Sequence, residues 1–158
     1  MKRTIVAASL LLPAAASAHI ALVAPAPRGT ALKQAPCGAG PSSLRGTPDA
    51  PIAPGSTITV SWLETVDHPS HYRISFDPDG QHFTVPPDTT SDTSATDPLV
   101  LLDLIPDIQG NFPAGGRPYQ QQVTLPNIAC DTCTLQVIQL MTDKPPYTTD
   151  AASTGARS

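Results

Sequence analysis

The chain has 158 residues and a formal net charge of −4. It contains no basic cluster, which argues against nucleic acid and anionic membranes as partners. Its 19 prolines exclude a helical bundle, because proline removes a backbone donor and clashes inside a helix. The length fits one domain, and the composition suits short strands joined by long loops.

The first 18 residues have the features of a secretory signal peptide. Lys2 and Arg3 precede a short apolar run over 5–16, and Ala-Ser-Ala at 16–18 supplies small residues for cleavage. The run is too short to span a bilayer, and no later segment approaches the about 18 apolar residues that a membrane helix needs. We therefore predict a secreted or periplasmic protein, cleaved after Ala18. Cleavage after Ala16 also fits the pattern.

Cleavage after Ala18 makes His19 the first residue of the mature chain. The α-amino group and the imidazole Nδ1 of a terminal histidine close a six-membered chelate, and one further imidazole completes three nitrogens around a metal. Nitrogen-rich, tetragonal coordination with open positions favours copper over zinc. Binding displaces a proton from the amine, so affinity should fall at acid pH. His19 is therefore a candidate ligand of one mononuclear copper ion.

The second imidazole can come from three positions. His68 stands in a turn, directly before Pro69, and His71 begins the next predicted strand. Both lie near a strand end, where a rigid scaffold displays functional loops. His82 follows the turn sequence Asp-Pro-Asp-Gly at 77–80 and is predicted to be a surface residue.

Alternating apolar and polar residues predict most of the strands. At 56–65, Ile58, Val60 and Trp62 share one face, the period-2 signature of a half-buried strand with Trp62 in the core. Residues 98–105 read as a buried strand or a short helix. Further strands are predicted at 20–24, 71–76, 119–125 and 133–141. The pattern predicts an all-β fold, an antiparallel β-sandwich of the immunoglobulin or fibronectin III type with long Pro/Gly-rich loops.

The chain has three cysteines: Cys37, Cys130 and Cys133. Export makes disulfides expected, but an odd count leaves one thiol over. Cys-Asp-Thr-Cys at 130–133 lacks the second pair that a zinc site would want, and it lacks the βαβ context of a redox motif. We interpret this segment as structural disulfide chemistry, with the pairing open.

Three segments, in this order, resemble the histidine-brace copper proteins. "HIALVAPAPRG" and "APCG" within 19–38 are similar to the opening of such proteins, in which a mature histidine precedes an apolar strand. "SWLETVDHPSHYRISF" at 61–76 resembles the segment that carries their second histidine. "CDTCTLQVIQLM" at 130–141 resembles a strand of lytic polysaccharide monooxygenases and their bacterial relatives.

The resemblance implies a copper ion held by the amine and ring of His19 and by the ring of His68, which would be the two catalytic residues. His71 is the alternative ligand, or a residue that stands beside the copper. Asp67 would orient a ring nitrogen, as carboxylates do around metal-bound histidines. The implied reaction is oxidative cleavage of a chitin- or cellulose-type polysaccharide with oxygen or peroxide and an external electron donor.

Two other functions stay open for this predicted monomer. One is a non-catalytic copper-binding or copper-delivery protein, whose partner would be another copper-handling protein. The other is a secreted carbohydrate-binding β-sandwich in which His19 has no role.

The end of the chain departs from the resemblance. The relatives continue beyond a "PPY" loop into a strand with a further cysteine, whereas here a small, polar tail follows over 148–158. We therefore expect a domain over 19–147 that lacks its C-terminal strand, and a disordered or aberrant tail. With that cysteine missing, Cys37 is expected to pair with Cys130 or Cys133, and a short Cys130–Cys133 bridge is the alternative. Whether the protein is an enzyme stays open.

Overall fold

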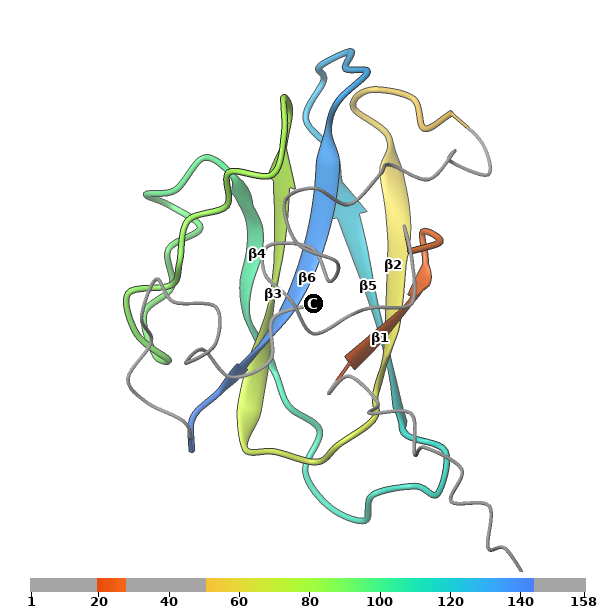
Figure 1. Cartoon of the computed structure of the whole chain (residues 1–158), viewed down its shortest axis with the longest axis vertical. Coiled ribbons are helices and arrows are strands. Elements are labelled where there is room, and N and C mark those ends of the chain that lie inside the picture. The colour runs from red at the N-terminus through yellow and green to blue at the C-terminus, as the bar shows by residue number, and fades with distance from the viewer. Residues whose placement is uncertain (1–19, 28–50, 144–158) are drawn as a thin grey trace, which may run out of the picture.

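The computed structural model describes residues 20–27 and 51–143, which form two antiparallel sheets (Figure 1). In one sheet, β2 (Thr57–Glu64) lies between β1 (Ile20–Ala24) and β5 (Arg117–Thr124). In the other, β3 (Ser70–Asp77) lies between β4 (Val100–Pro106) and β6 (Thr134–Met141). The described residues contain no helix, and therefore none that could cross a membrane. The all-β prediction is confirmed, and the ambiguous segment at 98–105 contains a strand that begins at Val100.

Strand β2 shows how the sequence pattern becomes structure. Val60 and Trp62 are fully buried, as the alternation predicted. On the other face, the hydroxyls of Thr57 and Thr124 lie 2.9 Å apart, and Gln122 Nε2 donates to Thr59 Oγ1 at 2.8 Å. Successive side chains of a strand point to opposite sides, so β2 presents apolar groups to the core and polar pairs to solvent.

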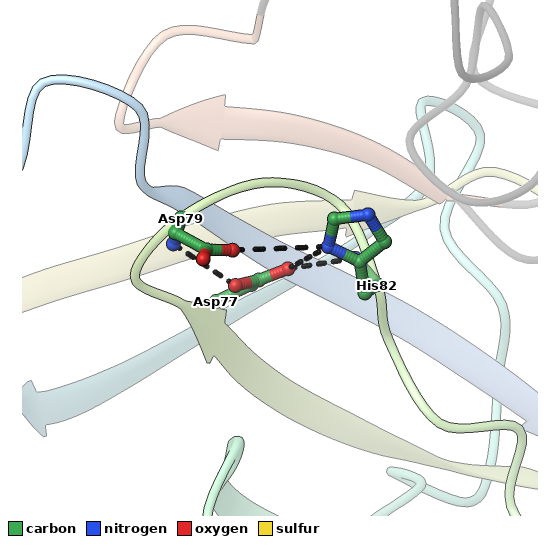
Figure 2. A group of neighbouring side chains, drawn as sticks. All are labelled: Asp77, Asp79 and His82. Atoms are coloured by element: carbon green, nitrogen blue, oxygen red, sulfur yellow. Dashed lines mark hydrogen bonds and ion pairs between the residues drawn. The ribbon is translucent and has the colours of Figure 1, made fainter.

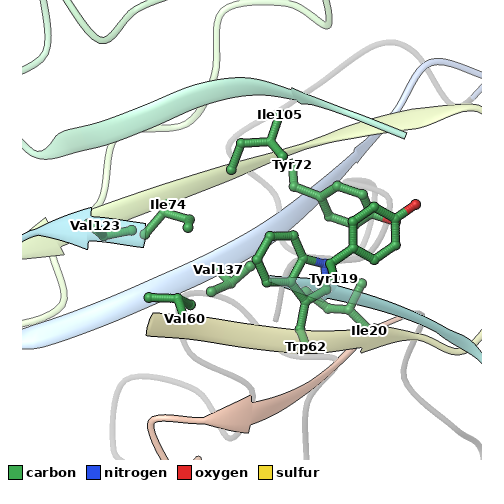
Figure 3. Close-up of a cluster of buried hydrophobic side chains, with 9 residues drawn as sticks. All are labelled: Ile20, Val60, Trp62, Tyr72, Ile74, Ile105, Tyr119, Val123 and Val137. Atoms are coloured by element: carbon green, nitrogen blue, oxygen red, sulfur yellow. The ribbon is translucent and has the colours of Figure 1, made fainter. Parts of the chain in front are cut away.

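The core lies between the two sheets and is centred on three aromatic rings (Figure 3). Trp62 on β2 stacks on Tyr119 of β5 with centroids 5.3 Å apart. Tyr72, from the opposite sheet, is tilted against both rings at centroid distances of 4.6 and 5.2 Å. Such pairs add about 0.5–1.5 kcal/mol each beyond their burial. The other residues of this cluster are Ile20, Val60, Ile74, Ile105, Val123 and Val137.

A buried ion pair lies on the other face of β3. The Arg73 guanidinium contacts both carboxylate oxygens of Asp103, at 2.7 and 3.1 Å, and both side chains are almost completely buried. Thr93 adds two donors, its backbone N–H and its hydroxyl, each 3.0 Å from Asp103 Oδ2. Asp103 reaches this position at an irregularity of β4, where Leu104 has a φ of 49° and the register with β3 shifts.

The Arg73–Asp103 pair predicts a large loss of stability on neutralisation. Asp103→Asn leaves the buried guanidinium without its counter-charge and should lower the free energy of unfolding by about 3–5 kcal/mol. Urea unfolding at pH 7 measures this loss. Asp92→Asn is the control, because Asp92 is exposed and its hydrogen bonds within the described ranges are to Ser94. It should change stability by less than about 0.5 kcal/mol.

The same pair sets a pH dependence. Burial alone would raise the pKa of Asp103, but the Arg73 and Thr93 contacts outweigh it and lower the pKa below its ordinary 3.8. The stabilisation is therefore complete above about pH 3.8 and disappears as the pH falls through the lowered folded-state pKa. The difference between the wild type and Asp103→Asn should shrink in that range. A constant difference down to pH 2 would contradict this account.

Candidate functional site

One end of the sandwich gathers the start of β1, the end of β2 and the turn over 65–69. Ile20, the first residue of β1, pairs with Glu64, the last residue of β2. The turn then crosses to the other sheet, and the loop over 107–116 lies at the same end (Figure 1). This end carries both Asp67 and His68, so it is the candidate site.

His68 is anchored through its backbone and its ring. Its backbone N–H donates to Glu64 Oε1 at 3.4 Å, and its Nδ1 lies 3.5 Å from Asp143 Oδ2. The ring is 17% exposed. Thr142 fastens the turn to the end of β6, because its N–H and its hydroxyl both donate to the Pro69 carbonyl, at 2.7 and 2.9 Å.

The carboxylate of Asp143 lies beside the His68 ring. The role of Asp67 in orienting a ring nitrogen stays a prediction. The Asp67 carboxylate is half exposed and lies 3.3 Å from Nη1 of Arg117. Asp143 follows β6, more than 70 residues from the turn in sequence. No local pattern connects these positions, because only the pairing of β3 with β6 brings them together.

His71 lies in a different environment. Successive residues of β3 alternate between the two faces of the sheet, so His71 shares a face with Arg73, whereas Tyr72 points into the core. His71 is 8% exposed. Burial lowers its pKa, with Asp103 opposing this shift and Arg73 adding to it. The structure therefore separates the two candidate ligands: His68 is in the turn, and His71 is beside the Arg73–Asp103 pair.

Two of the predicted residues, His19 and Cys37, lie outside the described residues. Cys130 and Cys133 are joined to each other by a disulfide, which corrects the expected pairing of Cys37 with one of them. Their Cα atoms are 5.6 Å apart, a usual separation for a disulfide. The bend over 130–133, just before β6, brings the two thiols together.

The buried pair of Glu64 and Arg117, which the sequence analysis missed, lies beside the turn over 65–69 and stabilises it. Glu64 and Arg117 are direct partners in the β2–β5 register, and Oε2 lies 3.1 Å from Nη1. Both residues are at most 4% exposed. The same Nη1 lies 3.3 Å from Asp67 and 3.5 Å from Asp107. These three carboxylates are close enough to hold a metal ion, but the guanidinium of Arg117 already supplies a cation among them.

Further contacts tie this group to both sheets. Gln139 on β6 donates to Glu64 Oε1 at 3.2 Å and to Ser70 Oγ at 3.0 Å. The Tyr119 hydroxyl donates to Asp107 Oδ1 at 2.7 Å. Burial raises the pKa of Glu64, as does Asp107, while the His68 N–H, Tyr119 and Arg117 act in the opposite direction. One signal in the sequence points to Glu64: it continues the buried face of β2 after Val60 and Trp62.

Comparisons with protein-family models, with curated proteins and with solved structures found no match to this chain.

Gly116 lets the chain just before β5 pass close to the backbone of Glu64, which places Arg117 opposite Glu64. Its φ is +91°, and a Cβ there would lie 2.6 Å from the Glu64 carbonyl oxygen. Gly116→Ala should therefore destabilise the protein by about 1–3 kcal/mol, as measured by urea unfolding. Gly115→Ala is the matched control, because a Cβ at Gly115 meets nothing within 4 Å. Equal stability of the two variants would show that the approach is not required.

Proposed function

We propose that this chain is an exported protein that binds one copper ion through the amine and ring of His19 and the ring of His68. The pairing of Ile20 with Glu64 carries the proposal. His19 directly precedes Ile20 in the chain, and consecutive Cα atoms are about 3.8 Å apart. The Glu64 carboxylate in turn accepts the His68 N–H. A mature chain that starts at residue 19 would thus begin beside the turn that carries His68.

The surroundings of His68 suit a ligand of a copper ion. Metal-bound histidines usually present their second ring nitrogen to a carboxylate or carbonyl, which fixes the tautomer and the ring orientation. Nδ1 of His68 faces Asp143 at 3.5 Å, an arrangement in which Nε2 would be the ligand atom. The Glu64–Arg117 group and the Thr142–Pro69 contacts would hold the turn in place while the ion binds.

The surroundings of the two histidines favour His68 over His71. β1 pairs with β2, in the sheet opposite to the one that contains His71. His71 points away from the space between the sheets and lies beside a buried guanidinium. His71 is also buried, at 8% exposed, whereas His68 is only partly buried and its ring has the carboxylate of Asp143 next to it.

For the architecture we propose an immunoglobulin- or fibronectin III-like sandwich. β2 and β3 follow each other in the chain but belong to different sheets, and so do β4 and β5. Such crossings between sheets are typical of Greek-key sandwiches. They also put the turn over 65–69 and the loop over 107–116 at one end, as the display of a binding site requires.

The proposed activity is oxidation of a polysaccharide C–H bond beside a glycosidic linkage, with oxygen or peroxide and an external electron donor. Bound copper would supply the redox chemistry. The protein would supply a solvent-facing end, where Val66 is 36% exposed and Ile108 is 51% exposed on the two neighbouring loops. The buried contacts beneath them would keep the histidine ligand fixed against the polymer.

One observation favours a second candidate, copper binding or delivery without oxygenase activity. Among the described residues, every aromatic side chain is buried or only partly exposed, and Trp62, Tyr72 and Tyr119 form the core. These residues therefore offer no exposed aromatic platform for stacking on sugar rings. The same observation weakens the carbohydrate-binding alternative.

Copper binding tests the proposal directly. The protein is prepared with a free His19 terminus, loaded with one equivalent of Cu(II) and examined by electron paramagnetic resonance. We expect three-nitrogen coordination that is lost in His68→Ala and in a form with one extra N-terminal residue, and that is kept in His71→Ala. Affinity should fall at acid pH, because the amine and the imidazoles must lose protons to bind.

The activity needs its own assay. Oxidised oligosaccharides released from chitin or cellulose in the presence of a reductant would support the monooxygenase, and copper binding without product would support the second candidate. An unchanged spectrum in His68→Ala, with loss in His71→Ala, would transfer the ligand to His71. An unchanged spectrum in the extended form would contradict the terminal chelate.

A further inference from the structure

A second group of metal-ligating side chains lies at the other end of β3, in the turn over 77–82 (Figure 2). Asp77 is the last residue of β3, and Asp79 and His82 follow it. Each residue offers one ligand atom, and the three atoms lie within 4.8 Å of one another. Ser70 begins β3 beside the turn of the proposed copper site, so the full length of the strand separates the two groups.

The donor atoms converge at distances close to those of a metal site. His82 Nδ1 lies 3.4 Å from Asp77 Oδ2 and 3.8 Å from Asp79 Oδ1. An ion bound at about 2.0–2.2 Å from nitrogen and oxygen ligands sets neighbouring ligand atoms about 3.0–3.5 Å apart. The third separation, between the carboxylate oxygens of Asp77 and Asp79, is within 4.8 Å, and a rotation of the exposed Asp79 side chain would bring the three atoms around one ion.

The turn orients two of the three donors. The Asp77 side chain is 5% exposed, and its carboxylate accepts the backbone N–H groups of Asp79 and His82 at 3.0 and 2.7 Å. Gly80 leaves room for the imidazole, because a Cβ at that position would lie 2.7–2.8 Å from the His82 ring atoms. The His82 ring therefore lies next to Gly80 in the turn, although its side chain is 83% exposed.

We propose that Asp77, Asp79 and His82 form a surface site for a zinc-like divalent ion. One imidazole nitrogen with two carboxylate oxygens suits Zn²⁺, whereas Ca²⁺ prefers an all-oxygen set. Water would complete the coordination, since Asp79 and His82 are both more than 80% exposed. The bound ion would fasten the turn to the end of β3. The site is independent of the proposed copper function.

Nuclear magnetic resonance of the mature protein, titrated with Zn²⁺, tests this site residue by residue. We expect saturable shifts of the His82 ring and of the backbone amides over 79–82, and no comparable shift with Ca²⁺. Asp79→Asn and His82→Gln should weaken this binding about tenfold or more. Both side chains are exposed, so both variants should fold. Gly80→Ala should weaken it as well, because it displaces the ring without removing a donor.

His68→Ala separates the two metal sites in the same titration. The zinc-induced shifts over 79–82 should persist in this variant, whatever happens at the proposed copper site. The proposal is overturned if His82 shows no saturable shift at millimolar Zn²⁺. It is equally overturned if His82→Gln leaves the amide shifts over 79–82 unchanged, or if Ca²⁺ produces the same shifts.

Discussion

The buried ion pair between Glu64 and Arg117 is the constraint on which this end of the molecule depends. Moving two charges out of water costs several kcal/mol per ion, and only close geometry with additional hydrogen bonds compensates for that cost. Here the pair is placed by direct register between β2 and β5. Gln139 and Tyr119 supply the further contacts. These contacts hold the Glu64 carboxylate in the position where it also accepts the His68 N–H.

This constraint connects the core to the proposed site. The stacked ring of Tyr119 belongs to the core, and its hydroxyl reaches Asp107 and Glu64 at the end of the sandwich. Desolvation and these contacts raise the pKa of Tyr119 to about 12, so the hydroxyl stays protonated and can donate. The turn over 65–69 is thus held by two contacts: Glu64 accepts the His68 N–H, and the Thr142 hydroxyl donates to the Pro69 carbonyl. A ligand on a turn fixed in this way needs little reorganisation to bind an ion.

The sequence predicted the strands well and their tertiary partners poorly. Alternation located β2 and the burial of Trp62, and the turn sequence at 77–80 placed His82 on the surface, where it is 83% exposed. These features depend on residues close together in the chain. The contacts of His68 with Asp143 and of Glu64 with Arg117 depend on strand register, which local patterns do not specify. The spacing of Cys130 and Cys133 does not reveal the shape of the loop between them, so the sequence alone does not predict that they pair with each other.

A crystal structure of the copper-loaded protein, prepared so that it begins at His19, tests the central claim most directly. The account predicts one copper ion at the start of β1, coordinated by the terminal amine, His19 Nδ1 and His68 Nε2, with Asp143 beside the other nitrogen of the His68 ring. Copper bound at His71, or found only at Asp77, Asp79 and His82, would contradict it.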